Sequence, residues 1–142
     1  MKVFEVVDQE EWMNVVSSVW VFWRKRYPDG SVRKLKARIC ARGFEQKENV
    51  DYFETFAPVV QWMTIRAMLI MTILLGLKNK QIDWTSAFLQ APIDTEVYME
   101  MPKLFSKPRK VWKLKRAIYG LKNSPRAYFL HVKSKFKELG FQ

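Results

Sequence analysis

The chain has 142 residues, 49% of them hydrophobic and 15% aromatic, and its 25 Lys and Arg against 14 Asp and Glu give a formal net charge of +11. This composition excludes a disordered tail, and the length fits about one domain. The positive charge predicts a polyanionic partner, with nucleic acid the first candidate and an acidic membrane surface the second. A basic surface that serves only solubility is the alternative.

Single residues and short runs exclude several classes of protein. Cys40 is the only cysteine and His131 the only histidine, so we expect no disulfide framework, no CxxC zinc site and no Ser-His-Asp arrangement. Residues 1–10 hold three carboxylates and no long apolar core, so we expect no signal peptide there. The longest apolar run, residues 67–77, is too short to cross a bilayer. We therefore expect a soluble intracellular protein.

The first part of the chain predicts a short helix and then a basic hairpin. Asp8–Met13 begins with a capping residue and acidic side chains, which is typical of a helix start. Val19–Arg26 and Val32–Arg42 have strand patterns, and the turn signal Tyr27–Ser31 joins them. A hairpin carrying several Lys and Arg is suited to contacting phosphates. The alternative is charge that only protects a free strand edge. After the hairpin, Gly43–Pro58 predicts an irregular connection with aromatic anchors.

A core helix and a strand are expected next. Thr64 is a candidate cap for a helix that runs to about Leu77, where Gly76 and a polar cluster would end it. The apolar residues of this helix predict deep burial. Further elements are expected in the remaining chain: a short strand at Glu96–Met101, a strand at Val111–Lys115, a loop at Ala117–Pro125, and a basic amphipathic helix from Pro125 to about Leu139.

Asp83 stands out within the stretch Gln81–Gln90, which predicts a buried strand followed by a helical turn at Ser86–Leu89. A carboxylate at the end of a buried strand is costly unless it is paired or binds a cation. Carboxylate oxygen suits Mg²⁺, so Asp83 is a candidate metal ligand. The alternative is an ordinary cap for a short helix that begins near Thr85.

Eight segments carry a pattern in order along nearly the whole chain: Trp20–Phe22, Pro28–Ser31, Lys36–Gln46, Asp51–Val60, Thr64–Arg66, Gln81–Leu89, Val97–Pro102 and Ile118–Arg126. Together they resemble the reverse transcriptase of copia-type LTR retrotransposons. The resemblance implies an α+β fold, specifically a partial right-hand polymerase fold. Residues 1–142 would then be part of a reverse transcriptase domain, with fingers at about 15–60 and a palm portion at about 61–142.

The resemblance also implies roles at the site of reaction. Asp83 matches the first metal-binding, catalytic Asp, with Mg²⁺ or Mn²⁺ as its cofactor. Phe88 matches the aromatic position beneath the nucleotide sugar, where a ring would exclude a 2′-hydroxyl; core packing is the alternative. Tyr119 and Gly120 match the loop near the incoming nucleotide and the template.

The basic residues are expected to contact phosphates. Lys25 and Arg38 are the candidates for the nucleotide's triphosphate, and a slip in strand register would move that role to Arg33 or Lys36. Four residues are candidates for contacts with nucleic acid: Lys36, Arg42, Lys122 and Arg126. The implied partners are an RNA or DNA primer–template and deoxynucleotides, without a membrane.

One departure from the family limits the expected activity. Two metal ions need at least two convergent carboxylates, yet no Asp-Asp pair occurs in the 142 residues, and Asp94 lies in a turn where a capping role is expected. We therefore expect a fragment of an RNA-directed DNA polymerase from a retrotransposon Pol polyprotein, truncated before the Asp-Asp hairpin and inactive alone. A basic nucleic-acid-binding remnant without chemistry is one alternative. A decayed, unstable copy with an exposed apolar patch is another. Family analogy gives a cytoplasmic, virus-like-particle location.

Overall fold

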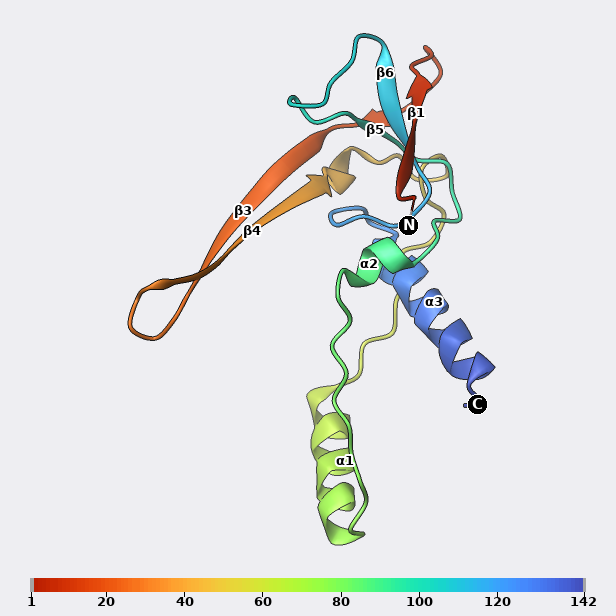
Figure 1. The fold of residues 1–142 in the computed structure, drawn as a ribbon. Helices are drawn as coiled ribbons and strands as arrows, with labels where there is room; N and C mark the ends of the chain where they lie inside the picture. Colours follow the sequence, from red (N-terminus) through yellow and green to blue (C-terminus); the bar gives the residue numbers. More distant parts are fainter. Residues whose placement is uncertain (1, 142) are drawn as a thin grey trace.

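A computed structural model describes residues 2–141 and has an α+β fold (Figure 1). Within these residues, four strands form one sheet in the order β1-β6-β5-β2. β1 pairs antiparallel with β6 and β6 antiparallel with β5, whereas β5 and β2 are parallel. The strands are β1 Phe4–Asp8, β2 Val15–Val16, β5 Tyr98–Glu100 and β6 Lys110–Leu114. The two strands expected in the C-terminal half are confirmed: β5 is shorter than the expected Glu96–Met101, and β6 begins and ends one residue before the expected Val111–Lys115.

No helix forms at Asp8–Met13, so that prediction was wrong: β1 ends at Asp8, and a turn at Glu11 and Trp12 follows it. Phe4 stacks on Trp112 of β6 with 3.9 Å between ring centroids, and Asp8 forms a 2.5 Å ion pair with Lys110. The pairing with β6 buries aromatic surface and satisfies the backbone groups of β1. This tertiary gain outweighs a local capping signal, whose typical worth is about 1 kcal/mol.

The basic hairpin is confirmed. β3 Ser18–Arg26 pairs antiparallel with β4 Val32–Ala41. In the turn, Gly30 has a φ of 85°, and the backbone N–H of Tyr27 donates to the carbonyl of Ser31 at 2.9 Å. The hairpin extends away from the sheet as an arm, and only its base packs on the rest of the chain (Figure 1).

The core lies between the four-stranded sheet, the base of the hairpin and the loop after β6. Its buried members come from β2, β4, β5 and the residues on either side of it, β6 and that loop: Val16, Ala41, Val97, Met99, Met101, Trp112, Leu114, Ile118 and Leu121. Two further helices flank this body: α2 Ala87–Gln90, and α3 Ser124–Glu138 with Pro125 in its first turn. Both helices agree with the sequence-based expectation.

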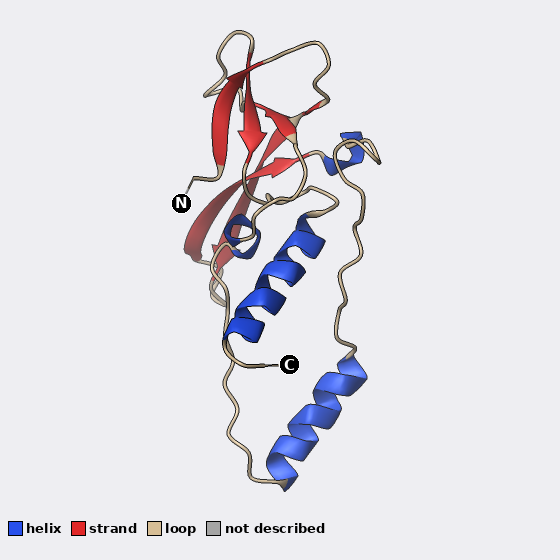
Figure 2. Cartoon of the chain, turned by 90° about the vertical axis from the view of Figure 1, so that its right-hand side faces the viewer, coloured by secondary structure: helices blue, strands red, loops and turns tan. Residues whose placement is uncertain are grey.

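The apolar helix exists as α1, Trp62–Leu74, but the expected burial is wrong. Its N-cap is Gln61 and not Thr64, and Gly76 ends it with a φ of 62° while the N–H of Leu77 donates to the carbonyl of Thr72 at 2.9 Å. None of its residues is buried. Figures 1 and 2 show α1 apart from the sheet, at the far end of two extended connections. An apolar pattern indicates that a helix favours burial, but it does not identify the element or partner against which the helix packs.

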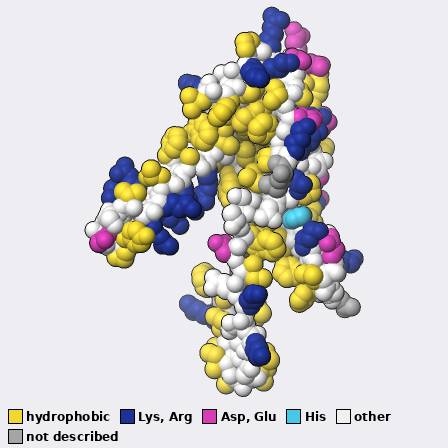
Figure 3. Space-filling view, in the orientation of Figure 1, with side chains coloured by type: hydrophobic (Ala, Val, Ile, Leu, Met, Phe, Trp, Pro, Cys, Tyr) yellow, Lys and Arg dark blue, Asp and Glu magenta, His cyan; other side chains and the backbone are white. Residues whose placement is uncertain are grey.

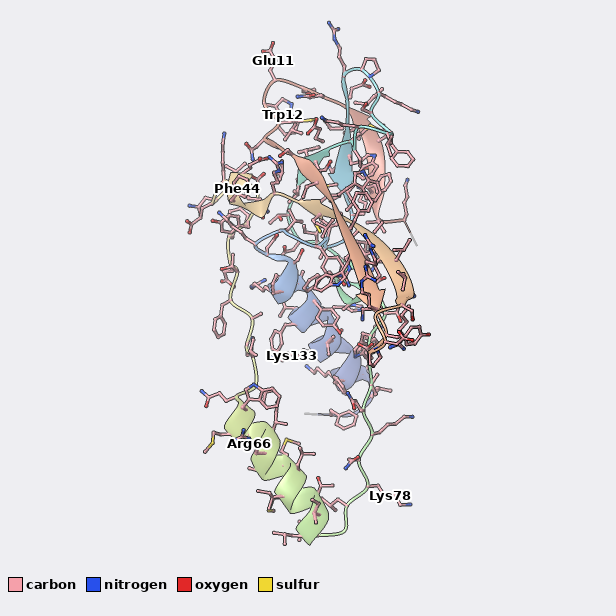
Figure 4. The ribbon with its side chains drawn as sticks, turned by 90° about the vertical axis from the view of Figure 1, so that its left-hand side faces the viewer. Glu11, Trp12, Phe44, Arg66, Lys78 and Lys133 are labelled. Carbon is pink, nitrogen blue, oxygen red and sulfur yellow. The ribbon has the colours of Figure 1, made fainter. Side chains whose placement is uncertain are left out.

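Two expectations about the irregular segments also fail. Asp83 lies in an exposed connection without strand structure, since no strand among the described residues runs beside it to complete a ladder. The aromatic anchors expected in Gly43–Pro58 mostly face solvent: Phe44, Phe53 and Phe56 are 75%, 64% and 78% exposed. Figure 4 shows Phe44 at the edge of the body, and Arg66 and Lys78 at the end opposite Glu11 and Trp12.

Within residues 2–141, no helix combines the length and the apolar character that crossing a bilayer requires.

Candidate nucleotide and nucleic-acid site

A cleft of about 830 Å³ lies between β4, the start of β1 and the connection that carries Asp83. Asp83 joins Lys36 and Arg38 of the hairpin and Tyr119 of the loop after β6 in its lining. These residues come from three separate parts of the chain. The structure therefore brings together four of the residues that the sequence singled out.

Strand alternation sets the charge of the hairpin face that lines the cleft. Lys34, Lys36 and Arg38 share one face of β4, and Lys25 is the cross-strand partner of Lys34. Repulsion by Lys25 is the main reason that the pKa of Lys36 is lowered, with desolvation next, while the negative charge of Asp83 acts in the opposite direction. Like charges this close make the face attractive to anions. Figure 3 shows Lys and Arg gathered on the hairpin arm.

A cluster of aromatic rings extends from Tyr119, in the cleft lining, to Phe88 and Tyr128, which lie outside that lining. The Arg38 guanidinium lies 5.0 Å from the centroid of the Tyr119 ring. Phe88 meets Tyr119 edge-on at 4.9 Å and meets Tyr128 of α3 at 5.9 Å. Burial, followed by the nearby charge of Asp83, raises the pKa of the Tyr128 hydroxyl. Phe88 is half-buried, so packing accounts for part of its surroundings and leaves part of the ring accessible.

The carboxylates do not complete a two-metal site. Asp83 is exposed, and residues 2–141 contain no group of three His, Cys, Asp or Glu side chains placed to hold a metal ion. Asp94 lies 3.4 Å from Arg126 and is not among the cleft residues. The donor set of the described chain therefore does not fit a pair of divalent ions.

Two glycines fix the position of Tyr119. The N–H of Ala41, at the end of β4, donates to the carbonyl of Tyr119 at 2.8 Å. Gly120 has a φ of 96°, and a Cβ added there would collide with the carbonyl of Ala41, just as one on Gly43 would collide with the carbonyl of Gly120. The backbone at Gly120 therefore lies directly against the end of the hairpin strand β4.

A buried polar network, which the sequence did not reveal as such, joins the same two segments. Gln46 accepts a 2.7 Å hydrogen bond from the N–H of Lys122 and donates to Asn123 at 3.4 Å. Asn123 donates to Thr95, which donates to the carbonyl of Asp51 at 2.9 Å. Gln46 and Asn123 both lie within segments that carry the family resemblance, but a pairing across 77 residues leaves no periodic signal.

The remaining candidates lie outside the lining of the cleft. Arg126 pairs with Glu54 at 2.5 Å, and the Lys122 ammonium lies 4.9 Å from the centroid of the Tyr52 ring. Arg42 is exposed, and Lys25 adds charge to the hairpin face without lining the cleft. Roles of these side chains in binding nucleic acid stay predictions, and the contacts of Arg126 and Lys122 give both a structural role.

The family model described as reverse transcriptase (RNA-dependent DNA polymerase) matches residues 1–142. The chain therefore belongs to the reverse transcriptase family, as the order of its motifs indicated. Within that family, its relatives are Pol polyproteins of copia-type retrotransposons.

Three of these relatives come from different hosts. The Pol polyprotein of transposon RE1 from Arabidopsis thaliana is 36% identical over 91% of this chain, and that of transposon TNT 1-94 from Nicotiana tabacum is 35% identical over 94%. The Gag-Pol polyprotein of transposon Ty1-ER2 from Saccharomyces cerevisiae is 35% identical over 84%. The chain covers 9%, 10% and 7% of their lengths, so it corresponds to a fragment of the reverse transcriptase domain. No solved structure matches the chain with statistical significance.

Proposed function

We propose that the chain is the fingers and part of the palm of an RNA-directed DNA polymerase, with the fingers at about residues 15–60 and the palm portion at about 61–142. The observation that carries this proposal is the shared cleft of Asp83, the hairpin cations Lys36 and Arg38, and Tyr119. Membership of the reverse transcriptase family supports the same assignment.

Each side chain then has a chemical task. Arg38 and Lys36 bind phosphate oxygens of a deoxynucleotide through charge-assisted hydrogen bonds, and Lys25 strengthens the positive field around them. Phe88 packs beneath the sugar, where its ring disfavours a ribonucleotide. Asp83 contributes one carboxylate toward Mg²⁺ or Mn²⁺. Because the described residues do not complete the donor set, we expect the 142-residue chain alone not to extend a primer.

Primer extension on an RNA template tests the proposal. The 142-residue chain, a longer Pol chain that includes the Asp-Asp pair, and the Asp83→Asn variant of the longer chain are compared with Mg²⁺ or Mn²⁺. We expect extension by the longer chain alone and its loss in Asp83→Asn. Extension by the 142-residue chain that disappears in its own Asp83→Asn variant would contradict the proposed incompleteness. An active longer chain unaffected by Asp83→Asn would contradict the role of Asp83.

A second candidate is a nucleic-acid-binding fragment without chemistry. The hairpin region, residues 18–42, carries eight Lys or Arg and one Asp, which favours a polyanion. Salt-sensitive binding of a primer–template without extension in any chain length would favour this candidate. A location in cytoplasmic virus-like particles stays a prediction by family analogy.

A further inference from the structure

We infer that Tyr119 is a positioning residue, whose ring holds the Arg38 guanidinium over the cleft while its edge contact supports Phe88. The inference rests on the proposed function in one respect: it takes the phosphates of a nucleotide as the ligand of Arg38. Tyr119 thereby contacts both Arg38, the proposed ligand of the phosphates, and Phe88, the residue proposed to pack beneath the sugar.

The hairpin face by itself does not hold Arg38 in place. Arg38 is exposed and shares its face with Lys34 and Lys36, so repulsion favours conformers that point into solvent. The Tyr119 ring, 5.0 Å from the guanidinium carbon, supplies an opposing attraction through its negative π face. No acidic residue pairs with Arg38 among the described ion pairs within 4.0 Å, so this ring is the contact that retains the guanidinium at the cleft.

Tyr119 is itself held firmly enough to act as a support. Its carbonyl accepts the hydrogen bond from Ala41, and Gly120 next to it packs against the same strand without room for a Cβ. The ring is half-buried and touches the edge of Phe88 at 4.9 Å. Because the backbone of Tyr119 is fixed and its ring packs against Phe88, the ring keeps one orientation toward the Arg38 guanidinium.

The test uses inorganic tripolyphosphate binding to the 142-residue chain, with the π electron density at position 119 as the variable. Tyr119→Phe and a series of increasingly fluorinated phenylalanines keep the shape of the ring while they weaken its attraction for a cation. We expect tripolyphosphate affinity to fall stepwise along the series, by about two- to fivefold in total. In an Arg38→Gln background, affinity is expected to be lower and the same series to have no effect.

A purely structural ring at position 119 would give another result, because packing does not depend on fluorination in this graded way. Affinity that is constant along the series, or that falls equally in the Arg38→Gln background, would overturn the inference. An unchanged affinity in Arg38→Gln would overturn it as well. Failure of the longer Pol chain to extend a primer, with the fluorination series behaving as expected, would instead reject the polymerase assignment and leave the Tyr119–Arg38 contact standing.

Discussion

Gly120 shows how a single missing Cβ positions the cleft. A methyl group at this position meets the carbonyl of Ala41, and the φ of 96° adds left-handed strain. We expect Gly120→Ala to lower the free energy of unfolding by about 2–5 kcal/mol, since left-handed backbone costs about 1–2 kcal/mol and overpacking about 1–3. Urea denaturation followed by circular dichroism measures this change.

Gly30 supplies the control for Gly120. It has a similar φ of 85°, but a Cβ there would have nothing within 4 Å. Gly30→Ala should therefore cost only the backbone term, about 1–2 kcal/mol. Equal losses in the two variants would show that the close approach to Ala41 contributes nothing.

Glu45 makes stability at the hairpin base depend on pH. The backbone N–H of Ser17 and then its hydroxyl donate to this carboxylate and lower its pKa below the ordinary value of 4.5. Stability from a carboxyl with a depressed folded-state pKa is fully present above the unfolded pKa and is lost as pH falls through the folded one. We expect Glu45→Gln to be less stable than the parent at pH 7 and the difference to shrink below pH 4.5.

Thermal unfolding between pH 3 and pH 7 measures that difference. Glu11→Gln serves as the matched control, because Glu11 is exposed on the turn after β1. A gap between the parent and Glu45→Gln that stays constant down to pH 3 would exclude the carboxylate as its source.

At the scale of elements, α1 is the part least supported by the rest of the chain. Leu69, Ile73 and Leu74 are 52%, 79% and 74% exposed. Exposed apolar surface of this kind promotes association. We expect Leu69→Lys with Ile73→Lys to reduce self-association in sedimentation velocity while leaving the melting temperature within about 2 °C, since exposed substitutions change stability by about 0.5 kcal/mol or less.

A control for this change lies in the core. Met99→Ala removes a fully buried side chain from β5 and should cost about 2–5 kcal/mol. A drop in melting temperature after the α1 substitutions as large as that for Met99→Ala would mean that α1 packs on the body.

The elements also show what sequence patterns can and cannot predict. The hairpin, α1 and α3 have local signals in turn residues, periodicity and Pro125, and all three are present. β1 was missed and a strand at Asp83 was wrongly expected because strands depend on partners far away in the chain. In the site, the alternation of side chains along the second hairpin strand would have been enough to place Lys34 on the same face as Lys36 and Arg38. The meeting of Gln46 with Asn123 depends on tertiary contacts that no local pattern encodes.

At the scale of the whole molecule, charge dominates the expected binding. Four cations share the hairpin face: Lys25, Lys34, Lys36 and Arg38. If each neutralises one phosphate, the logarithm of duplex affinity should fall against the logarithm of salt concentration with a slope of about −3 to −4. Lys34→Ala should reduce the magnitude of this slope by about 0.9.

Fluorescence anisotropy with a labelled primer–template, from 50 to 200 mM salt, measures the slope. Lys133→Ala on α3 is the control, because Lys133 is exposed on another element. Equal changes in slope for both variants would show that the charge acts through the whole surface and not through the hairpin face.

The strand order β1-β6-β5-β2 has a consequence for how the molecule could be divided. The outer strands β1 and β2 come from the chain before α1, and the inner strands β5 and β6 come from the chain after it. A single cut in one of the exposed connections beside α1 would thus yield two peptides that are still joined by the β1–β6 ladder, the β2–β5 ladder, the Ala41–Tyr119 contact and the Gln46–Asn123 network. We expect them to co-elute after limited proteolysis and to reassemble when mixed, as two complementing halves of one sheet.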